Sequence, residues 1–309
     1  MSRRWSRPRS RSARAALAAA VALTAAAAWA PAAAAGPLAS ACTGRAGHPQ
    51  TYRHVLVIVM ENHSASQIIG SPKTPYITKV ARRCGWAAQY HSITHPSLPN
   101  YLAMTSGSTS GIRTDCTACR SRRPSIFEQL DTAGRSWRAY EESMPSPCLR
   151  GDSGRYLMRH NPPVYFRHLR ATCPGSDVPM GTPARGALRH ALRKDVLPAY
   201  AFLTPDACHD MHDCPKTAGD AWLRSWLPMI LANASYRSGQ LVVFLTFDEG
   251  FGADNHVATI VLSPYVESGT VARTPFTHYS LLRTTENLLG LPLLGHARHT
   301  VGMRRGFGL

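Results

Sequence analysis

Acidic residues are scarce in this sequence. Its 309 residues include 18 aspartates and glutamates against 35 lysines and arginines, and the formal net charge is +17 at pH 7. Residues 1–14 contain six arginines and no acidic residue. This balance excludes an acidic protein and favours partners that carry negative charge, such as polyanions, anionic lipid head groups or phosphorylated substrates. The alternative is that the charge only maintains solubility, because the basic residues are scattered along the chain.

Internal repeats are absent, and no low-complexity tract follows residue 35, which excludes a repeat array. Residues 15–34 are almost wholly alanine, and Ala33-Ala34-Ala35 is a small-residue cleavage site. These features predict a secretory signal peptide over residues 1–35 and a secreted or cell-surface protein that begins near Gly36, with the export route open. A membrane anchor is the alternative, although alanine is a weak membrane residue. Without the six arginines, 29 basic residues face 18 acidic ones, a formal charge of +11.

No cysteine lies in the predicted signal peptide, and all eight cysteines follow it. An even number of cysteines in an exported chain predicts up to four disulfides. Cys116 with Cys119 and Cys208 with Cys214 are candidate local pairs, and Cys148 with Cys173 would close a long loop, but eight cysteines allow 105 connectivities and the sequence does not choose among them. A second CxxC motif is missing, which argues against a structural zinc site at the first one.

Strand and helix patterns alternate along residues 36–309. Strands are expected at residues 54–60, 86–90, 136–140, 198–203, 240–247 and 256–263, and helices at 74–83, 98–106, 125–133, 219–235 and 277–289. The alternation predicts a single α/β domain whose mostly parallel central sheet has helices on both faces. Residues 111–124 and 143–183 lack periodicity and are expected to be long loops.

Acidic pairs follow the two most apolar strands. The strand at 54–60 leads to Glu61-Asn62, and the strand at 240–247 leads to Asp248-Glu249. Because parallel strands end at the same edge of a sheet, their oxygen ligands predict a divalent-metal site. Alternatively, Glu61-Asn62 caps the next segment, and Asn62-His-Ser is a formal glycosylation sequon.

Ser97 lies two residues before Pro99, a proline that suits the first turn of a helix. A helix N-terminus offers free N–H groups and a positive dipole end to a phosphate, so a serine hydroxyl there is placed to attack phosphorus. The side-chain amide of Asn100 is expected to donate to a phosphoryl oxygen. The alternatives are that Ser97 is an ordinary helix cap and that His95 is structural rather than catalytic.

The densest group of titratable residues spans 206–213 and follows the expected strand at 198–203. Asp210 and His212 are expected to face the site, although chance clustering on a solvated loop is the alternative. His278, at the start of the helix expected at 277–289, is a better candidate for the site than His256.

Together these segments resemble the phosphoesterase family that contains bacterial phospholipases C and acid phosphatases, within the alkaline phosphatase superfamily. The shorter, secreted actinobacterial acid phosphatases, some acting on phosphatidylinositol 3-phosphate, are similar over nearly all of residues 36–309. The resemblance is carried by residues 55–62, 94–103, 210–213, 219–223, 241–250 and 277–284.

The resemblance implies an alkaline-phosphatase-like fold and phosphate monoester hydrolysis through a phosphoserine at Ser97, with Asn100 on the phosphoryl oxygens. It implies metal ligands at Glu61, Asn62, Asp248 and Glu249. Asp210-Met-His212 stands where two-zinc phosphatases have Asp-x-x-x-His, so the identity and number of divalent metal ions stay open. His95, His212 and His278 are expected to bind phosphate oxygens or protonate the leaving group, and cationic histidines predict an acidic optimum.

The implied substrate is a phosphorylated small molecule or a phosphoinositide. An anionic membrane surface is a further expected partner, no specific nucleic acid is expected, and the oligomeric state is left open. A phospholipase C-type phosphodiesterase is one alternative, and a non-catalytic basic polyanion-binding protein is another.

Overall fold

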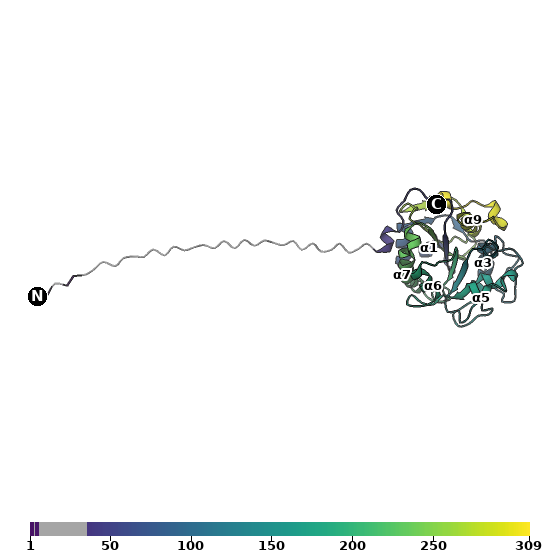
Figure 1. The fold of residues 1–309 in the computed structure, drawn as a ribbon, viewed down its shortest axis with the longest axis horizontal. Coiled ribbons are helices and arrows are strands. Elements are labelled where there is room, and N and C mark those ends of the chain that lie inside the picture. The colour runs from purple at the N-terminus through teal and green to yellow at the C-terminus, as the bar shows by residue number, and fades with distance from the viewer. Residues whose placement is uncertain (3, 6–35) are drawn as a thin grey trace. The chain divides into compact units, whose positions relative to one another are not determined.

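The computed structural model describes residues 1, 2, 4, 5 and 36–309 (Figure 1). The predicted signal peptide lies almost wholly outside the described residues. The chain divides into Met1–Ala34 and the compact unit Ala35–Leu309. Within the described residues, no helix has the length and apolar character needed to cross a membrane.

An eight-stranded sheet forms the centre of the compact unit, in the order β5-β4-β6-β1-β7-β8-β2-β9. Its strands are β1 (His54–Met60), β2 (Gly85–Ala87), β4 (Trp137–Glu141), β5 (Asp177–Pro179), β6 (Tyr200–Thr204), β7 (Leu241–Phe247), β8 (Thr259–Leu262) and β9 (Thr270–Ala272). All neighbouring pairs are parallel except those of β8, which is antiparallel to β7 and to β2. The prediction of a mostly parallel sheet is therefore confirmed.

The central strands β1, β6 and β7 are buried along their whole length, as expected for parallel strands covered on both faces. The register pairs Met60 with Phe247 at the ends of β1 and β7. Glu61 and Asp248 therefore leave the sheet side by side.

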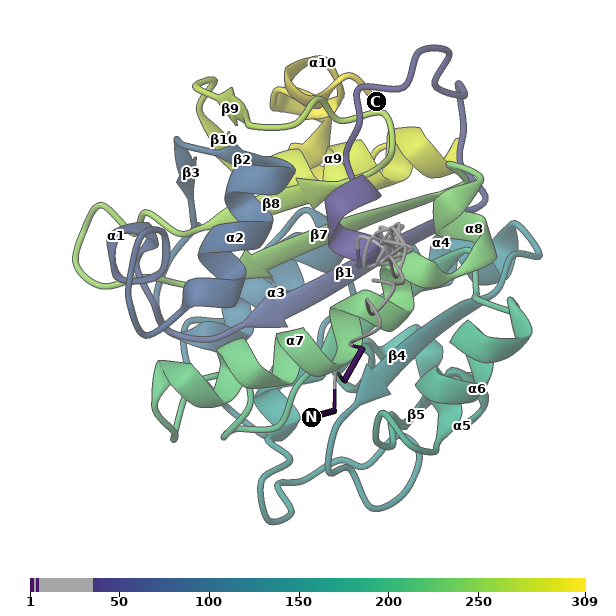
Figure 2. The same cartoon turned by 90° about the vertical axis from the view of Figure 1, so that its left-hand side faces the viewer.

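Helices cover both faces of the sheet. In Figure 2, α2 and α7 lie in front of the strands, and α3 and α9 lie behind them. The helices are α1 (Ala65–Ile68), α2 (Pro75–Arg83), α3 (Ser97–Ser106), α4 (Ile126–Thr132), α5 (Cys173–Ser176), α6 (Ala187–Lys194), α7 (Lys216–Ala232), α8 (Ala234–Arg237), α9 (His278–Leu289) and α10 (Arg304–Phe307).

Some predicted elements differ from those in the structure. The strand expected at 86–90 is two short strands, β2 and β3 (Tyr90–His91), and β3 pairs with β10 (Phe276–Thr277) in a separate two-stranded sheet. The helix expected at 219–235 is divided into α7 and α8.

Four disulfides are present, and they include the three candidate pairs. The fourth joins Cys42 to Cys84 and ties the segment before β1 to the end of α2.

Candidate active site

The site lies where β1, β7 and the loop after β6 end at one edge of the sheet. The Glu61 N–H donates to the carbonyl of Asp210, and the Asp248 N–H donates to the carbonyl of Met60, both at 2.9 Å. The second bond continues the pairing of β1 with β7, and the first ties the loop after β6 to the end of β1. The Glu61, Asp210 and Asp248 carboxyl groups are therefore positioned by the sheet itself, and all three residues are fully buried.

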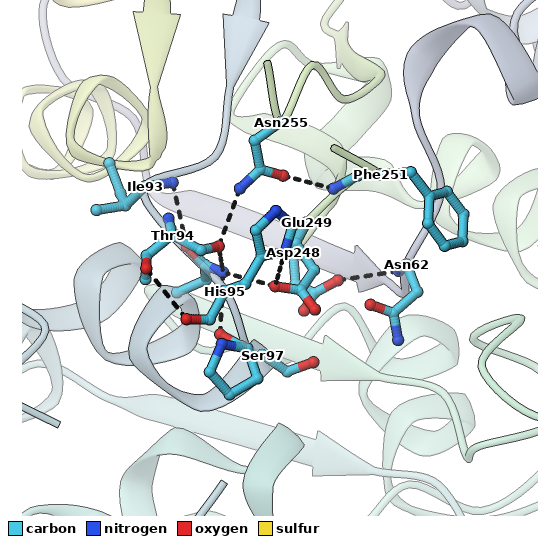
Figure 3. A network of polar contacts seen from close by, with 12 residues as sticks. Asn62, Ile93, Thr94, His95, Ser97, Asp248, Glu249, Phe251 and Asn255 are labelled. Atoms are coloured by element: carbon cyan, nitrogen blue, oxygen red, sulfur yellow. Dashed lines mark hydrogen bonds and ion pairs between the residues drawn. The ribbon is translucent and has the colours of Figure 1, made fainter. Parts of the chain in front are cut away.

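Asn62 turns the chain away from β1 with a φ of 54°, a left-handed conformation that asparagine tolerates better than most residues. Its backbone N–H donates to Asp248 Oδ1 at 3.1 Å. Figure 3 shows Asn62, Asp248 and Glu249 close to Ser97. The two acidic pairs predicted from the sequence are thus brought together.

Ser97 is the first residue of α3 and is buried. Its hydroxyl donates to Glu61 Oε2 at 3.1 Å, and Tyr101, one turn later, donates its hydroxyl to Glu61 Oε1. The Leu98 N–H donates to Asp115 Oδ1 at 2.9 Å. The serine hydroxyl therefore lies at the helix N-terminus expected from the sequence and beside a buried carboxylate, a contact that the sequence did not indicate.

Asn100 holds the loop that enters α3. Its Oδ1 accepts the N–H groups of Ile93 and Thr94 at 3.1 Å, and its Nδ2 donates to the carbonyls of Thr94 at 2.7 Å and Pro96 at 3.3 Å. Glu249 Oε2 is a further acceptor at 3.5 Å. The amide protons are therefore engaged within the protein, and the expectation that they bind a phosphoryl oxygen is not supported by these contacts.

His95 lies at the outer side of the site, with a side chain that is 46% exposed. Its Nδ1 is 2.8 Å from Glu249 Oε2, and its Nε2 is 3.2 Å from the Gly252 carbonyl. Glu249 thus links the exposed imidazole to the buried acids (Figure 3).

Asp210 and His212 reach the same edge from the loop after β6. The His212 N–H donates to Asp210 Oδ1 at 2.7 Å. The His212 ring joins the Asp213 carboxylate at 2.6 Å to the Arg159 guanidinium at 3.2 Å. Both residues were expected to face inward: Asp210 is buried, whereas His212 is partly exposed and held by a pair of opposite charges.

His160 is a site residue that the sequence did not indicate. It ends the short 3₁₀ helix η2 (Met158–His160) and is buried. Its Nε2 lies 3.3 Å from Glu61 Oε2 and its Nδ1 3.2 Å from Asp210 Oδ2. Its ring stacks on Tyr101 with an interplanar angle of 9°. Burial, followed by the charges of Arg159 and His212, lowers the pKa of His160 well below its usual range, so the imidazole is neutral.

His278 has a protein partner at each ring nitrogen, and these contacts do not support the expectation that it binds phosphate oxygens. It is fully buried at the start of α9, and both ring nitrogens have partners, the Asp248 carbonyl at 2.6 Å and the Tyr90 hydroxyl at 3.0 Å. Burial lowers the pKa of His278 to about 4. It therefore supports the Asp248 backbone as a neutral ring and supplies no cation for an acidic optimum.

The site brings together four carboxyl groups, which repel one another when they are ionised: those of Glu61, Asp210, Asp248 and Glu249. Burial, then Asp248 and Asp210, raise the pKa of Glu61 well above its usual range. Burial, then Glu249, do the same for Asp248, and burial raises the pKa of Asp210. Burial and the charge of Asp115 raise the pKa of Glu249 to about 7. Bringing these carboxylates together without a cation is costly.

The donor set fits a divalent cation. Asp248 Oδ2, Asp210 Oδ2 and His160 Nε2 are buried without a hydrogen-bond partner. Candidate ligand atoms of Glu61, His160 and Asp210 lie within 4.8 Å of one another. Carboxylate oxygens and a neutral imidazole bind divalent metals, and buried polar atoms otherwise find partners.

The contacts missed from the sequence differ in how they could have been found. Tyr101 follows Ser97 by four residues, so helical spacing places both on one face and predicts that they meet. His160 and Asp115 lie in loops without periodicity, and no local pattern connects either with Glu61.

Comparison with known proteins connects this site with a family. The Phosphoesterase family model matches residues 71–292. A phosphatidylinositol-3-phosphatase of Mycobacterium tuberculosis is 33% identical over 250 residues, 80% of each chain. An acid phosphatase of Aspergillus fumigatus is 30% identical over 225 residues, 67% of this chain, which spans about half (48%) of that relative.

Solved structures share the fold at low identity. A protein of the alkaline phosphatase superfamily from Vibrio parahaemolyticus is 12% identical with a TM-score of 0.57, over 86% of this chain and 74% of that one. The lipoteichoic acid synthase LtaP of Listeria monocytogenes is 10% identical with a TM-score of 0.56, over 79% and 73%. The chain belongs to the phosphoesterase family, with an alkaline-phosphatase-like fold, and is a phosphoric ester hydrolase.

Proposed function

We propose that this enzyme is a phosphatase that hydrolyses phosphate monoesters through a phosphoserine at Ser97. The observation that carries the proposal is the Ser97 hydroxyl, which lies at the N-terminus of α3 and 3.1 Å from a buried carboxylate. The family assignment indicates hydrolysis of phosphoric esters, and the Ser97 hydroxyl is the proposed nucleophile.

In the first step, Ser97 Oγ attacks phosphorus, and its proton passes to Glu61 Oε2, the atom to which it already donates. The leaving alkoxide departs with a proton from His212 or His95 at the rim of the site. In the second step, water attacks the phosphoserine and gives a proton to the rim histidine, while Glu61 returns its proton to Ser97 Oγ as the Ser97 Oγ–phosphorus bond breaks and inorganic phosphate is released.

Glu61, Asn62, Asp248 and Glu249 would hold a divalent metal ion, with Asp210 and His160 as further donors. The orphaned buried atoms of Asp248, Asp210 and His160 support this ligand set. A bound cation would lower the pKa of the serine hydroxyl and offset the charge of the phosphate. Arg159, beside His212, supplies positive charge at the entrance.

The other predicted residues act around this centre. His95 orients Glu249, and Asn100 fixes the loop that carries His95. His278 holds the Asp248 backbone in place.

The test of the nucleophile is Ser97→Ala. This variant should fold normally and lose several orders of magnitude in turnover of a chromogenic phosphate monoester, as other enzymes do without their nucleophile. Ser106→Ala, which removes a buried hydroxyl from the other end of α3, is the matched control. Acid quenching followed by peptide mass analysis should locate a phosphate on Ser97 in the wild type. Near-normal turnover by Ser97→Ala would disprove the proposal.

The test of the metal site is elemental analysis of the purified wild type and of Asp248→Ala and His160→Ala. Both variants should contain less metal and lose activity, because each removes a buried donor. Full activity after exhaustive chelation, with no metal in the wild type, would contradict the site.

We also propose that phosphatidylinositol 3-phosphate is a substrate and that the protein is exported from the cell. The mycobacterial relative is named for that lipid, and four disulfides favour an oxidising compartment. Phosphate release from liposomes that contain this lipid should exceed release from a soluble monoester at low salt and fall at high salt. A choline phosphodiester is assayed in parallel, and its preferred hydrolysis would indicate a phospholipase C-type enzyme. Poorer lipid turnover without salt dependence would leave a phosphatase of soluble monoesters.

A further inference from the structure

Arginines gather around two adjoining pockets formed by the loops before α4 and after β4. One cavity, of about 310 Å³, is lined by Arg120, Arg150, Arg167 and Arg170. A neighbouring cavity, of about 470 Å³, is lined by Arg120 and Arg167 again, together with Ser110, Arg122 and Arg123. The two shared arginines make this one continuous surface, here called the arginine pocket.

Within residues 36–309, no arginine of the arginine pocket forms an ion pair with a carboxylate. Over residues 36–309, the arginine ion pairs are those of Arg159 with Asp115 and of Arg224 with Asp220, and neither arginine lines the pocket. Burial, then the charges of Arg120 and Arg170, lower the pKa of Arg150. Like charges held together without carboxylates favour the binding of an anion.

The loops that carry these arginines are fixed. The Ser121 N–H donates to the Tyr165 carbonyl at 2.8 Å, and the Arg167 N–H donates to the Ser121 carbonyl at 3.0 Å. The Arg120 guanidinium donates to the Thr117 carbonyl at 2.7 Å.

Two disulfides add to this framework. Cys116–Cys119 directly precedes Arg120, and Cys148–Cys173 joins the segments that carry Arg150 and Arg170. The backbone that carries the pocket arginines is therefore fixed around one cavity before any ligand arrives, which reduces the entropy that the loops would lose on binding.

We propose that the arginine pocket is a binding site for a small anion with at least two phosphate groups, separate from the Ser97 site. Four guanidinium groups line the smaller cavity, whereas one phosphate carries a charge of only about −2 at neutral pH. Two phosphate groups are needed to balance the four, and the planar guanidinium fork binds phosphate oxygens in pairs. A concave pocket of this volume suits a compact ligand rather than a flat membrane surface.

The test uses methylenebisphosphonate, a bisphosphonate without a hydrolysable bridge, and the full purified protein in isothermal titration calorimetry. Arg150→Gln/Arg170→Gln removes two pocket charges. Arg185→Gln/Arg193→Gln removes two exposed arginines elsewhere and is the matched control for net charge. Each lost pocket arginine should weaken the pocket's binding event about tenfold, since a charged hydrogen bond contributes roughly 1.5 kcal/mol or more. The control should bind like the wild type.

Turnover of a soluble phosphate monoester should be unchanged in both double variants, because the pocket is separate from Ser97. Equal affinity in all three proteins would overturn the proposal, and so would an equal loss in the control. A fall in monoester turnover in Arg150→Gln/Arg170→Gln would overturn the separation of the two sites. Loss of adsorption to anionic liposomes with unchanged bisphosphonate binding would assign the arginines to a membrane surface instead.

Discussion

Glu61 is the side chain on which the site depends most. One of its oxygens accepts the Ser97 hydroxyl, the other accepts Tyr101, and His160 lies 3.3 Å away. Its backbone N–H is bonded to the Asp210 carbonyl. Because the carboxyl is buried among other acids, its geometry favours catalysis at the expense of stability, a common feature of active sites.

Glu61→Gln should therefore stabilise the metal-free protein while abolishing turnover. The amide keeps the shape of the side chain, and the Ser97 hydroxyl can accept a bond from it. In the presence of a chelator at neutral pH, the melting temperature should rise by about 2 °C or more, since 1 kcal/mol shifts Tm by roughly 2–4 °C in chains of this size. Glu267→Gln, at an exposed acid, should leave Tm unchanged. A lower Tm for Glu61→Gln would contradict the repulsion among the acids.

The sequence indicated residues that follow predicted strands, whether at once or on the next loop, and missed His160 and Asp115, which lie in long segments without periodicity. Glu61 and Asp248 could be found because an apolar run specifies where each strand ends. The role expected for His278 stays a prediction; its position before a helix gave no direction for its ring, which lies against the Asp248 carbonyl. His160 depends on tertiary packing alone.

Helix α7 contacts both α2 and the loop that carries Asp210, but it contributes no candidate metal ligand. Its Asp220 accepts the N–H groups of Tyr76 and Ile77 and so caps α2. Its Gly219 packs against the loop that carries Asp210. A Cβ on Gly219 would lie 2.5 Å from the Met211 side chain and 2.7 Å from the His209 carbonyl.

Gly219→Ala should therefore move the loop of residues 209–211, which carries Asp210. Turnover should fall because of this displacement. An overpacked contact costs about 1–3 kcal/mol, and small displacements of catalytic groups are expensive. Turnover should fall about tenfold or more. Ala221→Ser, on the exposed side of the same helix, is the control. Normal turnover with an unchanged melting temperature would show that the loop yields freely.

Helices and strands could be predicted from the sequence where the apolar residues follow a single repeat, either that of a helix or that of a strand. The strands β1 and β7 and the helices α2, α3, α4 and α9 match their expected ranges closely. The strand β5 (Asp177–Pro179) and the helix α6 (Ala187–Lys194) were missed. A three-residue edge strand carries no period, and α6 follows a Pro- and Gly-rich stretch that reads as loop.

The stability of the whole molecule should depend on a second group of buried acids, away from Ser97. Asp177 accepts a hydrogen bond from Asn161 at 2.9 Å, and burial raises the pKa of Asp177 to about 7. Burial, then Asp177, raise the pKa of Glu141 well above its usual range. The folded protein therefore binds more protons here than the unfolded chain does.

A raised carboxyl pKa stabilises the fold below the ordinary aspartate value and loses that contribution as pH rises through about 7. Asp177→Asn mimics the protonated acid. Its free energy of unfolding should fall less than that of the wild type between about pH 5 and pH 8. Urea unfolding across this range is the measurement, with Glu267→Gln as a control that should follow the wild type. Equal slopes in all three proteins would contradict a protonated Asp177.

The disulfides close two short loops, with sequence separations of 3 and 6 residues, and two longer ones, with separations of 25 and 42 residues. A cross-link restricts the unfolded chain less when its loop is short, so the longer two contribute about 3–4 kcal/mol each and the shorter two mainly order their own segments. Cys208–Cys214 encloses Asp210 and His212, and Cys116–Cys119 follows Asp115, whose carboxylate caps α3. When these two short disulfides alone are reduced, we expect the chain to keep its sheet and lose the order of the loops that they close. The enzyme would then be latent until it is oxidised, and its activity would report the redox state of its surroundings before its fold did.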